Sequence, residues 1–103
     1  MPDNPNRRHL ERVARCGCAV CIHMGLAEPF DTPAQAHHIK EETGASDRQD
    51  DWLTFGACPE HHTGASGIHT LKARGFYTRY GVSELDLVAK VLRLIYGPLK
   101  RVA

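Results

Sequence analysis

Apolar residues recur at the spacing of one helix face in two stretches, one near each end of the chain. Residues 7–15 and residues 83–96 both show the repeat of three or four residues that an amphipathic helix produces. The apolar positions are Leu10, Val13 and Ala14 in the first stretch and Leu85, Val88, Leu92 and Ile95 in the second. Ser83 and Asp86 resemble a capping box with Asp in place of Glu, and Gly97-Pro98 ends the second pattern. We therefore predict an N-terminal and a C-terminal helix, with residues 1–6 as a flexible tail.

Two short stretches in the middle have the character of strands. Residues 52–57 alternate large apolar residues with Thr54 and Gly56, and residues 34–40 end in His37-His38-Ile39-Lys40. The segment between them, 41–51, is polar and holds three aspartates. These features predict a hairpin with a long exposed loop. A further helical pattern follows over 68–74, after a turn with two glycines.

The composition is that of an ordinary globular protein. At 103 residues, with 42% apolar and 24% charged residues, the chain predicts a single α+β domain covering 1–103, small enough for a bound zinc ion to contribute to its stability. The apolar runs are too short to cross a membrane, and residues 1–15 lack the apolar centre of a signal peptide. We therefore expect a cytoplasmic protein, a setting that favours metal-bound cysteines over disulfides.

Four residues have the spacing and chemistry of a closed structural zinc site. Cys18 and Cys21 are separated by two residues, as are Cys58 and His61. A Cys3His set is a common structural zinc ligand set, and the turn over 16–21 would direct two thiolates at one ion. Cys16 leaves an alternative open, in which it replaces Cys21 or Cys18 as a ligand; we expect it to be a spare thiol.

More histidines remain than a structural zinc domain needs. His37, His38, His62 and His69 lie near the zinc ligands in the sequence, and a hydrolytic metal site with an open coordination position would use such residues. For each of them the simpler interpretation is a solvated side chain. The order of the motifs argues against that interpretation for His37 and His38, whereas the glycines between His62 and His69 rule out assuming one continuous helix. The other two histidines, His9 and His23, are expected at the surface.

Positive charge is local, because the net charge is only +1. One group of basic residues lies near the start and another follows the last histidine, and either could be an ordinary solvated helix face. The groups are Arg7, Arg8, Arg12 and Arg15, then Lys72, Arg74 and Arg79. Any contact with nucleic acid is therefore expected to use local patches.

The order of motifs resembles the HNH, or His-Me finger, endonucleases. The motifs that carry the resemblance are Cys18-Ala19-Val20-Cys21, Ala36-His37-His38-Ile39, Asp51-Trp52-Leu53-Thr54, Cys58-Pro59-Glu60-His61-His62, Gly67-Ile68-His69 and the stretch from Phe76 to Tyr80-Gly81. The resemblance implies a ββα-metal core with a structural zinc knuckle over 16–69. It also implies that His37, His62 and His69 bind a catalytic metal, that His38 is the general base, and that Asp51 steadies the loop. Asp47 and Asp50 compete with Asp51 for that last role.

Within the family, the stretch from Cys18 to Leu87 is most similar to the phage-associated subgroup typified by the RecA-dependent nuclease Ref. That similarity implies phage recombination or DNA processing as the setting, with RecA or another recombination protein as a partner. Two features depart from the subgroup, the additional Cys16 and the near absence of a long basic N-terminal extension.

The function expected from these observations is a metal-dependent endonuclease that nicks or cuts DNA with little sequence preference. Lys40, Arg48, Lys72 and Arg74 lie near the motifs and would contact phosphates. Histidine ligands favour Zn²⁺, Ni²⁺, Co²⁺ or Mn²⁺, whereas Mg²⁺ would keep bound water at most positions. The alternative is a noncatalytic zinc module that binds DNA or a protein partner, and a metal-storage or sensing protein is a third class.

Overall fold

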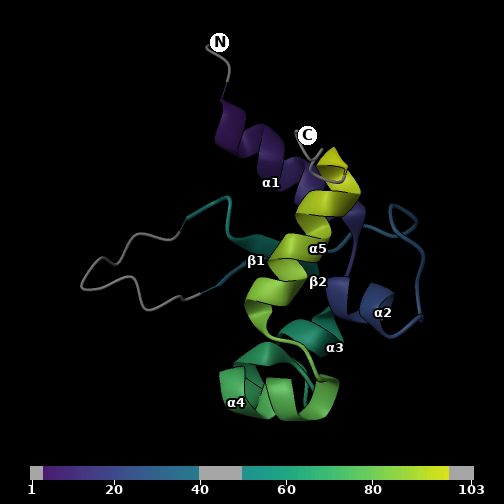
Figure 1. Ribbon diagram of the computed structural model, residues 1–103, viewed down its shortest axis with the longest axis vertical. Helices are drawn as coiled ribbons and strands as arrows, with labels where there is room; N and C mark the ends of the chain where they lie inside the picture. The colour runs from purple at the N-terminus through teal and green to yellow at the C-terminus, as the bar shows by residue number, and fades with distance from the viewer. Residues whose placement is uncertain (1–3, 40–49, 98–103) are drawn as a thin grey trace, which may run out of the picture.

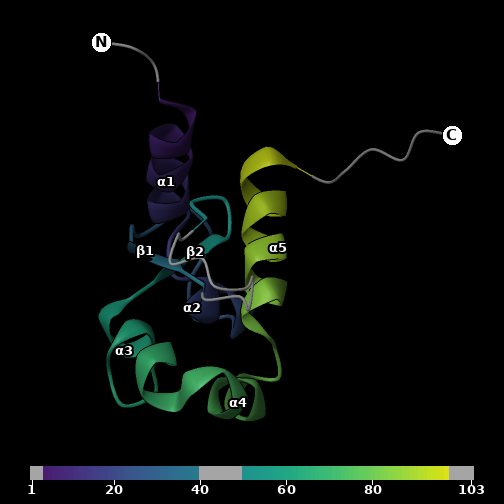
Figure 2. The same ribbon diagram turned by 90° about the vertical axis from the view of Figure 1, so that its left-hand side faces the viewer.

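The computed structural model describes residues 4–39 and 50–97, which form helices and a two-stranded sheet. The elements in chain order are α1 (Pro5–Cys16), α2 (Ala19–His23), β1 (Gln35–His38), β2 (Thr54–Ala57), α3 (Pro59–His62), α4 (Ile68–Tyr80) and α5 (Glu84–Tyr96). The sheet lies midway along the molecule, with α1 toward one end and α3 and α4 toward the other (Figure 1). α5 runs alongside α1 and the hairpin (Figure 2). The predicted α+β class is confirmed.

The helices at the two ends begin at side-chain caps. α1 begins two residues earlier than the apolar pattern predicts, because Asn4 Oδ1 accepts a hydrogen bond from the backbone N–H of Arg7 at 3.2 Å and Pro5 suits the first helical position. Pro5 and Asn6 are therefore helical rather than part of a tail. α5 has the expected capping box: Ser83 Oγ accepts from Asp86 N at 3.1 Å, and Asp86 Oδ2 accepts from Ser83 N at 2.9 Å. Gly97 follows its last turn, as predicted.

The two strands pair as the predicted hairpin. They are antiparallel, with Gln35 opposite Ala57 and His38 opposite Thr54. Both strands are shorter than the sequence pattern suggests. Most of the expected loop between them, including Asp47, lies outside the described residues. At the end of that loop, Asp50 Oδ1 accepts from Trp52 N at 2.9 Å and so fixes the entry into β2.

The hydrophobic core forms where α1, α2 and α5 pack on β2. Phe55 on β2, Val13 on α1 and Val91 on α5 are each 0% exposed, and burial of such side chains contributes about 1.5–3 kcal/mol each. Gly56 lies so close to the loop after α1 that a Cβ there would run into the carbonyl oxygen of Gly17. Only glycine fits at this position. The close approach lets Cys18 pair with Gly56 as an isolated β-bridge, two residues before Cys58 in the chain.

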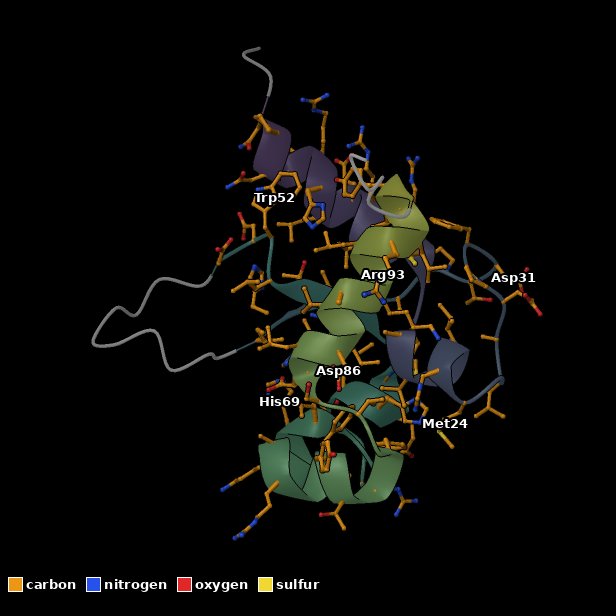
Figure 3. The ribbon with its side chains drawn as sticks, viewed as in Figure 1. Met24, Asp31, Trp52, His69, Asp86 and Arg93 are labelled. Atoms are coloured by element: carbon orange, nitrogen blue, oxygen red, sulfur yellow. The ribbon has the colours of Figure 1, made fainter. Side chains whose placement is uncertain are left out.

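The prediction that His9 lies at the surface was wrong. Its side chain is 0% exposed and stacks on Trp52 with ring centroids 4.0 Å apart, while Nδ1 lies 2.7 Å from the hydroxyl of Tyr96. Trp52 lies beside α1, toward the opposite end of the molecule from His69 (Figure 3). The physical reason is helical spacing: His9 precedes Val13 by four residues and therefore shares its buried face. His23 also has a partner, because its Nε2 lies 3.1 Å from the carbonyl oxygen of Tyr80.

The helix predicted over 68–74 extends to Tyr80 but contains a break. Lys72 has φ 60° and ψ 175°, so α4 consists of two helical segments joined at that residue. Gly81, in the left-handed conformation, ends the second segment. Within residues 4–39 and 50–97, no helix is long and apolar enough to cross a bilayer.

Candidate metal centres

Three cysteine sulfurs and one histidine nitrogen converge at the first centre, which comprises Cys18, Cys21, Cys58 and His61. His61 Nδ1 lies 3.5, 3.4 and 3.2 Å from the sulfurs of Cys18, Cys21 and Cys58, and the sulfurs of Cys21 and Cys58 are 3.9 Å apart. A tetrahedral zinc ion with ordinary bond lengths requires about 3.6 Å between nitrogen and sulfur and about 3.8 Å between sulfurs. The cluster therefore has the dimensions of a zinc site and could hold a structural metal.

Local backbone structure holds these ligands in place. Cys18 is the N-cap of α2, where its sulfur accepts from Cys21 N at 3.4 Å, and Cys58 is the N-cap of α3. In the absence of a cation, burial and the neighbouring Cys18 and Cys58 thiols raise the pKa of Cys21 to about 12. A bound cation reverses that effect, since a coordinated thiol loses its proton. Metal binding at this cluster would therefore release protons.

Cys16 is not part of this cluster. It is 0% exposed and packs in the hydrophobic core, and burial raises the pKa of its thiol. The ligand set with Cys18 and Cys21 is therefore the one that the geometry supports, and the alternatives that include Cys16 are not.

A second centre consists of His37 from β1, His62 from α3 and His69 from α4. One nitrogen from each lies within 4.8 Å of the others, and the Nε2 atoms of His62 and His69 are 3.0 Å apart. The three differ in accessibility, because His37 is buried, His62 is half-buried and His69 is exposed. A ligand bound among them could therefore be reached from solvent on the His69 side.

The turn between α3 and α4 brings His62 and His69 together although the helix is interrupted. Glu60 Oε2 accepts from Ser66 N at 2.9 Å and from Ser66 Oγ at 2.8 Å, which lowers the pKa of Glu60. Thr70 Oγ1 donates to the carbonyl oxygen of Gly64 at 2.8 Å. These contacts fix the turn, so the expected break at the glycines does not prevent the two imidazoles from meeting.

The surroundings of His62 favour a neutral imidazole. Burial lowers its pKa, and the nearby His37 and His69 lower it further. Since the neutral form is the one that binds metals, this environment suits a metal ligand.

Adjacent residues of α3 contribute to different centres. His61 is buried against the cysteines, whereas His62 faces the three-histidine cluster. Successive residues in a helix are rotated by about 100° around its axis, so neighbours in sequence point in different directions. The expected division of His61 and His62 between two groups is what the geometry displays.

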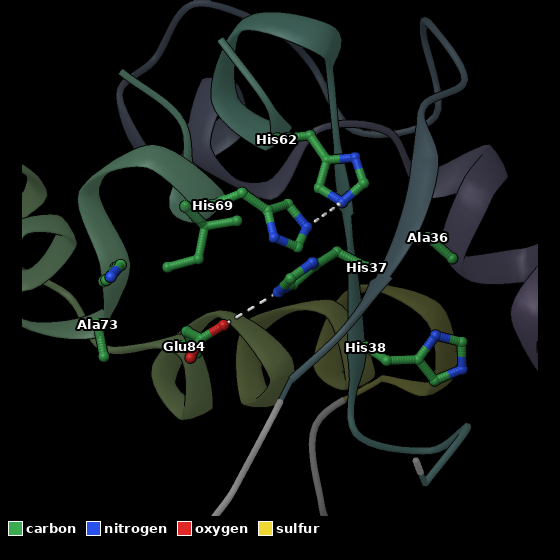
Figure 4. Close-up of a pocket in the computed structure, with 9 residues that line it drawn as sticks. Ala36, His37, His38, His62, His69, Ala73 and Glu84 are labelled. Carbon is green, nitrogen blue, oxygen red and sulfur yellow. Dashed lines mark hydrogen bonds and ion pairs between the residues drawn. The ribbon is translucent and has the colours of Figure 1, made fainter. Parts of the chain in front are cut away.

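The three-histidine cluster lines an open pocket with a volume of about 540 Å³. The lining residues are Ala36, His37, His38, His62, Ile68, His69, Lys72, Ala73 and Glu84. The ring of His38 points away from the cluster (Figure 4). Its Nε2 lies 2.7 Å from Asp51 Oδ1, and both side chains are partly exposed. Asp51 also anchors the start of β2, because Thr54 Oγ1 donates to its carbonyl oxygen at 2.9 Å.

Sequence reasoning missed Glu84, the carboxylate that contacts the cluster. Its Oε1 lies 3.0 Å from His37 Nε2 (Figure 4). The capping pattern marked Glu84 as the first residue of a helix, but no local pattern relates it to His37, which lies 47 residues away in the chain.

The basic residues expected to contact phosphates are distributed unevenly. Lys72 lines the pocket, and Arg74 is exposed two residues further along α4. Lys40 and Arg48 lie outside the described residues. Lys72 is therefore the cation that the described structure brings to the histidine cluster.

Comparison with protein-family models, with curated proteins and with solved structures finds no match for this chain. The functional interpretation therefore depends on the sequence motifs and on the geometry of the two centres.

Proposed function

We propose that this protein is a metal-dependent endonuclease that hydrolyses DNA phosphodiester bonds, with a ββα-metal centre of the HNH type beside a structural zinc site. The observation that carries the proposal is the pocket itself. A three-histidine cluster and His38 line one open cavity, and His38 is paired with the Asp51 carboxylate. Phosphodiester hydrolysis needs both elements, a general base for water and positive charge near the phosphate.

His38 is suited to the role of the base. The Asp51 carboxylate accepts a hydrogen bond from His38 Nε2–H, which leaves Nδ1 with the lone pair that can take a proton from water. A carboxylate that fixes the tautomer and orientation of a catalytic histidine is also found in the serine protease triad. Asp51 would thus orient the base as well as steady the loop.

The three histidines would bind the catalytic ion. A divalent ion held by His37, His62 and His69 would supply positive charge to stabilise the developing charge on the phosphate. Imidazole ligands favour Zn²⁺, Ni²⁺ or Mn²⁺, and Mg²⁺ would need water at most of its positions.

Lys72 would position the substrate backbone, because it brings a positive charge to the rim of the pocket. Contacts of this kind carry no sequence information, which agrees with a nuclease of low specificity. Additional phosphate contacts from Lys40, Arg48 and Arg74 depend on their position near the motifs in the sequence. A role in phage recombination and a partnership with RecA depend on the family resemblance.

A plasmid-cleavage assay tests the proposal. Zinc-loaded protein should nick or cut plasmid when Mn²⁺, Mg²⁺ or Ni²⁺ is added, and His38→Ala should lower the rate by about 10²- to 10⁴-fold. His23→Ala is the matched control, since His23 lies outside the pocket lining and should leave the rate unchanged. Equal rates for the parent and His38→Ala would remove His38 from the mechanism.

One observation favours a second candidate, a noncatalytic zinc module that binds DNA or a protein. The His38 ring is turned away from the three-histidine cluster (Figure 4), whereas a base must reach a water molecule near the phosphate. The same assay separates the candidates, because a noncatalytic module would bind DNA without cutting it under any of the metal conditions.

A further inference from the structure

We propose that Glu84 is a positioning residue of the three-histidine centre, and that it holds the His37 ring in the orientation and tautomer that bind metal. The inference concerns the same centre as the proposed function and therefore depends on a metal ion binding there. It assigns part of that centre to α5, an element outside the segment over which the metal-binding motifs occur.

The contact between the two side chains determines which nitrogen of His37 is available. Glu84 Oε1 lies 3.0 Å from His37 Nε2, and the side chains are 17% and 8% exposed. A carboxylate accepts hydrogen bonds, so Nε2 is the donor. Neutral imidazole carries one proton, and Nδ1 therefore keeps its lone pair for a metal ion.

The ring of His37 lies between Glu84 and the other two histidines (Figure 4). Its centroid is 5.1 Å from that of His62 and 5.0 Å from that of His69. On a further side it contacts Phe55, with centroids 5.1 Å apart. The Phe55 side chain thus confines the His37 ring on one side. Glu84 forms a hydrogen bond with the ring on the side that faces away from His62 and His69.

Glu84 is itself held rigidly. It is the first residue of α5, directly after the capping box of Ser83 and Asp86. Leu87, Val88 and Val91 anchor the helix in the core. The helix dipole also favours a negative charge at this position. A fixed carboxylate that accepts from the outer nitrogen of a metal-bound histidine orients that ligand and raises its basicity.

A titration with Co²⁺ tests this role. Zinc-loaded protein would be titrated with Co²⁺ and the heat of binding measured for the parent and for variants of Glu84. Glu84→Ala should weaken Co²⁺ binding by about 10- to 100-fold, the usual effect of removing such a contact. Glu84→Gln should retain most of the affinity, because the amide oxygen can accept the same hydrogen bond from Nε2–H.

The matched control is Glu28→Ala, which removes an exposed glutamate outside the pocket lining. It should bind Co²⁺ like the parent, and all three variants should keep their zinc content. A merely structural role for Glu84 would alter the melting temperature and leave the Co²⁺ affinity unchanged, and that result would overturn the proposal. Equal losses for Glu84→Ala and Glu84→Gln would also overturn it, by showing that the carboxylate binds the ion directly.

The outcome can be separated from that of the nuclease proposal. Co²⁺ binding that depends on Glu84, in a protein that cuts no DNA, would support the positioning role and contradict the nuclease function. A protein that cuts DNA, but whose Co²⁺ affinity does not change in Glu84→Ala, would support the nuclease function and contradict the positioning role. A parent protein that binds no Co²⁺ beyond its zinc site would overturn both.

Discussion

His9 is a buried histidine in which one ring nitrogen has a hydrogen-bond partner and the other has none among the described residues. Nδ1 contacts the Tyr96 hydroxyl, while Nε2 is buried and has no hydrogen-bond partner among the described residues. Burial is the main cause that lowers the pKa of His9, and the nearby Arg12 guanidinium lowers it further, against the opposing effect of Asp51 and Asp50. Folding therefore favours the neutral imidazole.

The pH dependence of stability follows from this shift. Because the folded-state pKa lies below the unfolded value of about 6.5, the unfolded chain binds the proton more readily, and His9 destabilises the fold progressively as pH falls below that value. His9→Phe retains an aromatic ring against Trp52 but cannot titrate. Melting temperatures of both proteins, measured between about pH 7.5 and about pH 5, should show the parent losing more stability in acid. Parallel losses would show that His9 does not titrate in this range.

Residues whose partners are set by local spacing could be predicted from the sequence, and residues whose partners are distant could not. Cys18 and Cys21, like Cys58 and His61, are pairs within one turn, so spacing alone identifies them. Glu84 meets His37 through tertiary packing. The burial of His9 had a local signal, the four-residue spacing to Val13, but a polar residue does not count toward an apolar pattern.

At the scale of elements, α4 contains a strained residue at the pocket. Lys72 has a positive φ of 60° with an extended ψ of 175°, a conformation that side chains with a Cβ rarely adopt. Such strain costs on the order of 1–3 kcal/mol and is concentrated at functional sites. Lys72 also lines the pocket of the histidine cluster, as expected if it contacts phosphate.

Two replacements of Lys72 should separate the effect of backbone strain on folding stability from the effect of the positive charge on DNA binding. Lys72→Gly relieves the backbone strain at an entropic cost of about 0.5–1 kcal/mol, so the variant should be more stable than Lys72→Ala by about 1 kcal/mol. Both variants lack the charge and should bind DNA more weakly than the parent. Thermal melts and DNA titrations at fixed salt measure the two effects. A Gly variant that melts below the Ala variant would show that Lys72 is not strained.

The elements that the sequence predicted well begin or end at local signals. The capping box at Ser83 marked the start of α5, and Gly97 marked its end. α4 was predicted to end at residue 74, because its apolar pattern was based on Ile68 and Leu71 alone, whereas the glycine that caps the helix, Gly81, lies seven residues further on. The strand ends were overestimated because pairing with a partner, which defines a strand, is not local information.

At the scale of the whole molecule, the hairpin and α3 connect two centres of different accessibility. The cysteine cluster is largely buried between α2 and α3, and the histidine cluster opens to solvent. If zinc fills the first, its binding energy contributes directly to folding of a domain this small. An ion in the second would be bound after folding, because its ligands come from β1, α3 and α4.

The central claim is that neighbouring residues, His61 and His62, serve different ions, and two alanine variants test it most directly. Zinc content, melting temperature and plasmid cleavage would be measured on the same preparations. His61→Ala should lose zinc and melt at a much lower temperature, because it opens the structural site. His62→Ala should keep its zinc and melt nearly like the parent, yet fail to cut DNA. Two variants that behave alike, both unfolded or both active, would contradict the account.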